Sequence, residues 1–171
     1  LKVALAAEPT SMDPHYQNLT INNSFATQIY NALVLQDVNQ NLIPGLATSW
    51  KPVDDRTWEF ALRKNVKFHN GAAFTAGDVI ASMERAANVP NSPSSFATFT
   101  KGKQFEMVDD FTIRVSTEKP YPFTPNDMSR ISIIDSAFLK ATTEDFNTGV
   151  ASHGTGPFTL TKWLPGDVIE I

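Results

Sequence analysis

The chain contains no cysteine, and this absence removes several kinds of chemistry at once. Disulfides, thiolate nucleophiles and every zinc site with a cysteine ligand are excluded. Histidine is scarce as well: the three histidines are not paired with one another or with two carboxylates at the spacing of a zinc site. We therefore expect no metal site and no cofactor, and no set of residues stands out as catalytic.

Positive charge is also limited. Lys and Arg number 14 against 18 Asp and Glu, which gives a formal net charge of −4, and no cluster of basic residues occurs. Proteins that bind the phosphate backbone of nucleic acids depend on such clusters. We expect no nucleic-acid partner.

Long apolar runs are missing. The uninterrupted apolar stretches are a few residues long, whereas a membrane-spanning helix needs about 20 residues. An apolar share of 42%, with 12 Phe and 3 Trp, nevertheless predicts a folded core rather than a disordered chain. No basic segment followed by an apolar one opens the sequence, so we expect any export signal to be absent from it.

Two helices are indicated by the pattern of apolar residues. Phe25, Ile29 and Leu33 recur at helical spacing and predict one apolar helix face. Thr75, followed by an acidic residue in the first turn, is typical of a helix N-cap. This second helix is expected to end near Ala87, before Pro90.

Alternation of apolar and polar residues predicts several strands, so the expected fold class is α/β (mixed α+β). The last predicted strand has no later segment to pair with, which we interpret as a sign that the sequence is a fragment of a longer protein. The predicted strands are residues 2–7, 57–63, 104–108, 111–115, 158–163 and 168–171.

Some motifs resemble catalytic or phosphate sites only superficially. Asp54-Asp55 and Asp109-Asp110 fall at turns, where aspartate commonly bonds nearby backbone groups. Gly154-Thr155-Gly156 is not followed by Lys-Ser/Thr or by a predicted helix, so we interpret it as a tight turn rather than a phosphate loop. His69, beside a turn, is expected to be structural or solvated.

Phe96 and Phe99 have two interpretations. They follow a loop rich in proline and serine, residues 88–95. Either the rings pack into the core, or they form an exposed wall on which a ligand stacks.

A longer set of motifs resembles a known family. These motifs are EPTSMDPH at residues 8–15, PGLATSW at 44–50, WEFALRKNVKFHNG at 58–71, FTAGDV at 74–79, ERA at 84–86 and GTGPF at 154–158. In order and spacing they resemble the family-5 extracellular solute-binding proteins, the peptide/nickel-type receptors of bacterial ABC importers.

The resemblance implies a periplasmic binding protein-like lobe with a split domain and an inserted β-rich domain. The split domain would comprise residues 1–43 and 154–171, and the inserted domain residues 44–153. The second lobe, which closes over the ligand in this family, would lie outside this chain.

The resemblance also implies substrate-binding residues. In peptide-binding relatives, the segment between the Asp-Pro-His stretch and the next helix touches the ligand backbone, and the region of residues 96–99 resembles a stretch that supplies an aromatic side chain. Arg130 lies near a strand that carries a ligand-contacting arginine in nickel-binding relatives. The residues implied in this way are Asn18, Leu19, Thr20, Phe96, Phe99 and Arg130.

The function implied is the capture of peptides or a related small solute for an ABC importer. The expected partners are the solute and the permease subunits in the inner membrane. The expected location is the periplasm, or the cell exterior with a lipid anchor in a Gram-positive bacterium. A secreted hydrolase and a ligand-sensing module for a signalling partner remain as alternatives.

Overall fold

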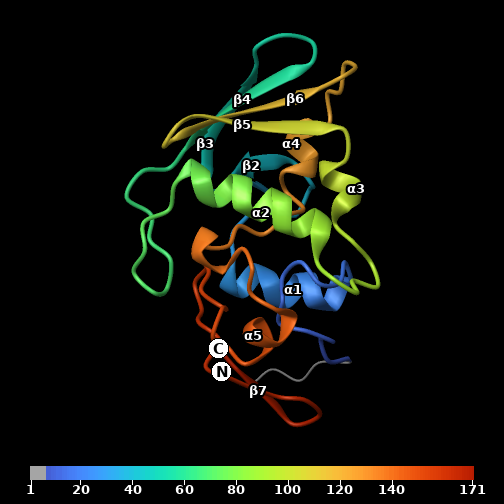
Figure 1. The fold of residues 1–171 in the computed structure, drawn as a ribbon, viewed down its shortest axis with the longest axis vertical. Helices are drawn as coiled ribbons and strands as arrows, with labels where there is room; N and C mark the ends of the chain where they lie inside the picture. The colour runs from blue at the N-terminus through green and yellow to red at the C-terminus, as the bar shows by residue number, and fades with distance from the viewer. Residues whose placement is uncertain (1–6) are drawn as a thin grey trace.

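The computed structural model describes residues 7–171. The strand predicted at residues 2–7 therefore lies outside the described residues, apart from Ala7. Figure 1 shows a four-stranded sheet at one end of the molecule and helix α2 (Ala76–Asn88) packed beneath it. Helices α1 (Thr20–Ile29) and α5 (Thr143–Asn147) lie at the other end with the β7 hairpin.

The sheet is antiparallel throughout, with strand order β3-β4-β6-β5. On β4, Phe60 and Leu62 are buried whereas Glu59 points to the opposite face, where it pairs with Lys51 and Arg114. The alternation predicted for residues 57–63 is thus confirmed. The strands predicted at 104–108 and 111–115 are also present, and they form the hairpin of β5 and β6. The strands are β3 (Ala47–Pro52), β4 (Thr57–Leu62), β5 (Lys103–Asp109) and β6 (Thr112–Thr117).

Helix α2 begins and ends where the sequence predicted, within one residue. The Asp78 carboxylate accepts a hydrogen bond from the Thr75 N–H at 2.7 Å, as in a capping box. Val79, Met83 and Ala86 face the core beneath the sheet.

A second stripe of α2 is polar and buried. Asp78, Ser82 and Arg85 recur at helical spacing and are each at most 5% exposed. Asp78 accepts a hydrogen bond from the Ser136 N–H, and Ser82 Oγ accepts one from the Ile134 N–H, both at 2.9 Å. The helix is therefore held on one side by apolar packing and on the other by hydrogen bonds to the returning chain.

The chain contributes to two separate hydrophobic cores. Leu33 and Ile133 belong to the core beneath the sheet, whereas Tyr30 and Ile134 belong to the core between α1 and α5. The chain thus passes from one core to the other at lower residue numbers than the expected domain limits of 43/44 and 153/154. Those limits remain predictions, and the two cores favour crossings near residues 31 and 134.

The first predicted helix is shorter than its apolar pattern. It ends at Ile29, because Tyr30 is extended and Ala32 forms an antiparallel bridge with Ser132. Leu33 is fully buried, but in the other core. The expectation that Leu33 shares the helix face is wrong because long-range pairing ends the helix first.

The last two strands form a hairpin with each other. They are β7 (Lys162–Leu164) and β8 (Val168–Glu170), joined in antiparallel register. Residues 158–161 are not strand; the Phe158 N–H donates to the Gln28 carbonyl at the end of α1. The strand predicted at 158–163 is therefore mostly wrong, and the last strand does have a partner in this chain.

The remaining elements are short and connect these layers. They are β1 (Val34–Gln36), β2 (Leu42–Pro44), α3 (Ala97–Thr100), α4 (Thr124–Asp127) and the 3₁₀ helix Ser136–Phe138.

Gly154 and Gly156 lie against the end of α1. A Cβ on Gly154 would meet the Ile29 carbonyl oxygen at 1.9 Å, and one on Gly156 would meet the Ile29 carbonyl carbon at 2.6 Å. Gly156 N–H also donates to that oxygen at 2.8 Å. Close backbone approach, rather than the conformation of a tight turn or phosphate binding, explains the glycines of this motif.

Candidate ligand-binding edge

The segment Asn18–Thr20 lies at the start of α1 and is accessible. Asn18 is half-buried, whereas Leu19 and Thr20 are exposed. The Asn18 N–H donates to the Ser94 carbonyl at 3.0 Å, and Gln17 forms a parallel bridge with Ser94. Residues 18–20, called the ligand edge below, are thus tied to the proline- and serine-rich loop.

Helix α1 begins without a side-chain cap. Leu19 occupies the N-cap position and has no side-chain acceptor to offer, and the Asn23 N–H is the first to bond back, to the Leu19 carbonyl. Because the first N–H groups of a helix have no partner within it, Thr20 offers a backbone donor at this edge.

The structure separates Phe96 from Phe99. Phe96 is 1% exposed and packs edge-on against His15, with ring centroids 6.2 Å apart. Phe99 lies against Phe96 and is half-buried. In this chain the packing interpretation describes Phe96, and only Phe99 keeps ring surface on which a ligand could stack.

Arg130 is exposed at the end of the turn that follows α4. Its N–H donates to the Asp127 carbonyl at 3.0 Å. Within residues 7–171, no hydrogen bond or ion pair links its side chain to the ligand edge or to the loop 88–95. The structure therefore brings together the edge and the aromatic stretch through Ser94, but it does not link Arg130 to them.

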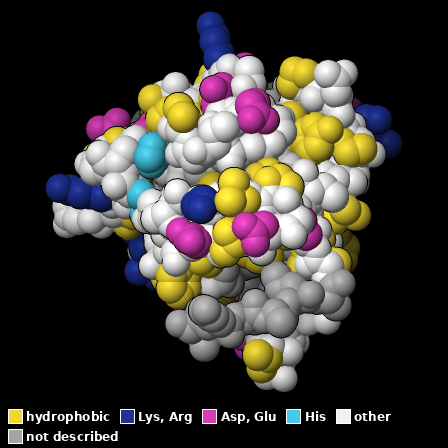
Figure 2. Space-filling model, turned by 90° about the horizontal axis from the view of Figure 1, so that it is seen from below, with side chains coloured by type: hydrophobic (Ala, Val, Ile, Leu, Met, Phe, Trp, Pro, Cys, Tyr) yellow, Lys and Arg dark blue, Asp and Glu magenta, His cyan; other side chains and the backbone are white. Residues whose placement is uncertain are grey.

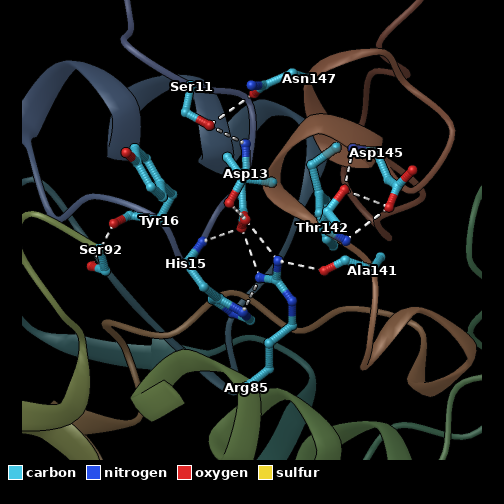
Figure 3. Close-up of polar contacts among 12 residues, drawn as sticks. Ser11, Asp13, His15, Tyr16, Arg85, Ser92, Ala141, Thr142, Asp145 and Asn147 are labelled. Atoms are coloured by element: carbon cyan, nitrogen blue, oxygen red, sulfur yellow. Dashed lines mark hydrogen bonds and ion pairs between the residues drawn. The ribbon is translucent and has the colours of Figure 1, made fainter. Parts of the chain in front are cut away.

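Behind the ligand edge lies a buried ion pair that the sequence did not reveal. Arg85 donates to both oxygens of Asp13, at 2.7 and 2.6 Å, and the two side chains are 5% and 0% exposed (Figure 3). Asp13 also accepts from Thr143 Oγ1 at 2.9 Å and from the His15 N–H at 3.0 Å. Both carboxylate oxygens therefore have two donors each, which satisfies the group fully.

The pKa values of Asp13 and His15 are both below their ordinary values. Burial opposes ionisation of Asp13, but the hydrogen bonds and positive charge of Arg85 outweigh it and hold the pKa of Asp13 below its ordinary value. Burial, and then the Arg85 charge, lower the pKa of His15 to about 4. Asp13 is thus ionised and His15 neutral near neutral pH.

The hydrogen bonds of His15 define its tautomer. Nε2 lies 2.8 Å from the Ser132 carbonyl oxygen, which can only accept, so Nε2 carries the proton. Nδ1 then accepts from Arg85 Nη1 at 3.2 Å. Both ring nitrogens are engaged, and the residue is 0% exposed.

Ser11, Asp13 and His15 carry the residue types of a hydrolase triad but not its geometry. Ser11 Oγ donates to Asn147 Oδ1 at 2.8 Å instead of to the histidine. A nucleophile must be bonded to its base and open to substrate. This cluster fixes the fold of the N-terminal segment and does not offer a nucleophile.

The sequence carried one signal for this cluster. Arg85 stands at helical spacing from Asp78 and Ser82, so the three share a stripe of α2. Asp13, however, lies 72 positions away in the chain. No local pattern links it to α2, and the stretch Met12-Asp13-Pro14 looks only like a turn.

The other candidate groups behave as turn or structural residues. Asp54 accepts from the Arg56 N–H and Asp109 from the Phe111 N–H, as expected of aspartates at turns. His69 Nε2 lies 2.9 Å from the Gly156 carbonyl oxygen, which is a structural contact. Among residues 7–171 no group of three or more His, Asp or Glu is arranged to hold a metal ion.

The surface near α1 and α5 carries mixed side chains. Figure 2 shows this end of the molecule, where acidic and basic side chains are scattered among hydrophobic ones without a basic patch. None of the helices in the described part of the chain has the length and apolar character that crossing a membrane requires.

Comparison with known proteins identifies relatives along nearly the whole chain. The model of the bacterial extracellular solute-binding proteins, family 5 (middle region), matches residues 41–171. The glutathione-binding protein GsiB of Pectobacterium atrosepticum is 28% identical over 170 residues, which are 99% of this chain and 33% of that protein. The chain thus spans about a third of the length of such relatives.

Solved structures agree with this match. OppA of Burkholderia pseudomallei superposes with a TM-score of 0.85 at 23% identity, over 96% of this chain and 36% of that one. DppA of Helicobacter pylori, in complex with the peptide STSA, gives 0.78 at 27% identity, over 95% and 36%. The mixed α/β fold expected from the sequence is confirmed.

Proposed function

Because this chain belongs to family 5 of the bacterial extracellular solute-binding proteins, we propose that it is part of the substrate-binding component of a bacterial ABC importer. The protein captures a peptide or a related small solute outside the inner membrane and delivers it to the permease. Its location is the periplasm, or the cell exterior with a lipid anchor in a Gram-positive bacterium.

The observation that carries this proposal is the ligand edge. It is accessible, it offers the backbone donor of Thr20 at an uncapped helix start, and it is tied to a neighbouring loop through Ser94. A backbone edge can bond an extended peptide whatever the peptide's side chains are. Phe99 offers an apolar surface nearby for a side chain of the ligand.

Transport depends on closure of a second lobe over the bound ligand. A ligand that contacts both lobes shifts the protein toward the closed form, which the permease recognises. This chain supplies one wall of such a cleft, in keeping with its coverage of a third of GsiB. We therefore expect the isolated chain to bind the solute weakly.

Two relatives support peptides as the ligand class. GsiB is described as glutathione-binding, and DppA was solved with the peptide STSA. The hydrolase alternative is disfavoured because His15, the histidine next to the edge, is buried with both nitrogens occupied.

The test is binding without turnover by the full-length protein. Isothermal calorimetry with glutathione and with the peptide STSA is expected to show saturable binding of at least one of them, while mass spectrometry finds each probe intact after incubation. Cleavage of a probe would support the hydrolase instead. Absence of binding, together with no peptide-like solute co-purifying with the protein, would contradict the proposal.

A further inference from the structure

We propose that Arg85 is a positioning residue for the ligand edge: it holds Asp13 and His15 and thereby helps to set where residues 18–20 lie at the start of α1. This inference rests on the proposed function. It assigns a ligand-affinity role to a residue that cannot itself touch a ligand, since Arg85 is 5% exposed.

Few residues separate the contacts of Arg85 from the ligand edge. The guanidinium bonds Asp13 through two nitrogens and His15 through one. Only residues 16 and 17 separate His15 from Asn18, and both are engaged with the loop: Ser92 Oγ donates to the Tyr16 carbonyl at 2.6 Å, and Gln17 bridges Ser94. A shift of His15 therefore displaces Tyr16 and Gln17, and with them the loop contacts that position Asn18.

Arg85 also affects how the segment is oriented, because it contacts four different groups at once. Besides Asp13 and His15, it donates from Nη2 to the Ala141 carbonyl at 3.3 Å (Figure 3). Its guanidinium carbon also lies 4.3 Å from the centre of the Phe146 ring. A planar, forked cation can make these contacts together, whereas a lysine offers a single nitrogen. The site thus depends on arginine and not merely on a positive charge.

Besides Arg85, two sets of contacts hold the N-terminal segment: Asn147 and Thr143 hold residues 11–13, and Ser92, Ser94 and Asn23 hold residues 16–18. Asn147 Oδ1 accepts from Ser11 Oγ and from the Met12 N–H, and Thr143 bonds only one oxygen of Asp13. Without Arg85, the Ser132 carbonyl is the remaining polar partner of the His15 ring. The ring could then pivot about that bond, and the edge would be held only by its contacts with the loop 88–95 and with Asn23.

A loss of affinity could also follow from general destabilisation, and α2 offers a matched control. Met83 is on the same helix and 2% exposed, but it packs into the core beneath the sheet. Met83→Ala leaves a cavity there and leaves the contacts of Arg85 in place. It should lower the melting temperature without moving the ligand edge.

The experiment compares Arg85→Met, Arg85→Lys, Met83→Ala and Thr20→Pro in the full-length protein. The dissociation constant for glutathione, or for the peptide STSA if that is the probe bound, is measured by calorimetry well below each melting temperature. Amide hydrogen exchange of residues 15–20, which needs no ligand, is followed by mass spectrometry. Arg85→Met is expected to weaken binding about tenfold or more and to speed exchange in residues 15–20. Arg85→Lys, which keeps the charge, should lose at least about threefold, whereas Met83→Ala should stay within about twofold.

The outcomes separate this inference from the proposed function. Weakened binding in Thr20→Pro with unchanged affinity and unchanged exchange in both Arg85 variants overturns the positioning role and leaves the proposed function intact. Equal losses in the Arg85 variants and Met83→Ala overturn it as well, because stability alone then explains them. Unchanged affinity in Thr20→Pro contradicts the ligand edge, and the inference falls with it. If Arg85→Met does not fold, Arg85→Lys alone decides by the same criteria.

Discussion

Arg85 on α2 holds Asp13, 72 positions earlier in the chain, through both terminal nitrogens at 2.7 and 2.6 Å. The pair joins the helix beneath the sheet to the segment that leads into α1. Breaking a buried pair leaves one charge without a partner, which costs about 3–5 kcal/mol. Asp13→Ala should therefore lower the free energy of unfolding by about this amount in urea denaturation.

An exposed pair provides the control for Asp13→Ala. Asp55 lies 3.5 Å from Arg56, and their side chains are 69% and 58% exposed. Such a pair contributes little, so Asp55→Ala should change the unfolding free energy by less than about 0.5 kcal/mol. If both substitutions lower the unfolding free energy by the same amount, burial does not make the Asp13–Arg85 pair more stabilising than an exposed pair.

The neutral state of His15 predicts how stability depends on pH. The folded protein keeps a pKa of about 4 for His15 against an ordinary 6.5. Between these values the unfolded chain binds a proton that the folded chain does not, so stability falls as the pH falls from about 6.5 to about 4. The loss attributable to His15 is at most about 3 kcal/mol.

His15→Gln isolates this contribution. Glutamine can donate to the Ser132 carbonyl and accept from Arg85 but does not titrate in this range. Asp13, whose pKa is below its ordinary value, contributes stability that is lost only at still lower pH, and it is present in both proteins. Chemical denaturation at several pH values should show a shallower loss for the variant; parallel profiles would mean that His15 is not held neutral.

Much of the fold near the sheet was predictable because its signals are local. The cap of α2 and the alternation of β4 depend on residues a few positions apart. The end of α1 was not predictable, since it is set by Ala32 pairing with Ser132, about 100 residues later. The same holds for the candidate site: the ligand edge was expected from a motif, but the cluster behind it depends on contacts such as Ser11 with Asn147, 136 positions apart.

Phe60 tests the face assignment of β4. It is fully buried beneath the sheet, so Phe60→Ala should lower the unfolding free energy by about 3–5 kcal/mol. Val38, which is 98% exposed, is the control, and Val38→Ala should be neutral. A denaturation midpoint unaffected by Phe60→Ala would show that this core tolerates the cavity or that the ring is not packed as described.

Gly154 tests the close contact between the returning chain and α1. A Cβ there would meet the Ile29 carbonyl oxygen at 1.9 Å, so Gly154→Ala requires the backbone to move. Gly71 has φ of +88° and nothing within 4 Å of a Cβ, so Gly71→Ala pays only the conformational penalty of about 1–2 kcal/mol. We expect Gly154→Ala to be the more destabilising of the two in thermal unfolding, and the reverse order would contradict the contact.

The central claim, that residues 18–20 bind the solute through backbone groups, is tested most directly at Thr20. Thr20 is the first residue of α1, where proline is well tolerated, and Leu19 has ψ of 146°, which suits a residue before proline. Thr20→Pro therefore removes one N–H donor while circular dichroism stays unchanged. Thr20→Ala keeps that donor and removes only the hydroxyl and methyl groups of the side chain.

The decisive measurement is the dissociation constant of the full-length protein for glutathione, or for the peptide STSA if that is the probe bound, in these two variants. The account predicts that Thr20→Pro weakens binding about tenfold or more, or about 1.4 kcal/mol, while Thr20→Ala stays within about twofold of the unchanged protein. Equal affinity of a folded Thr20→Pro variant and the unchanged protein would contradict it.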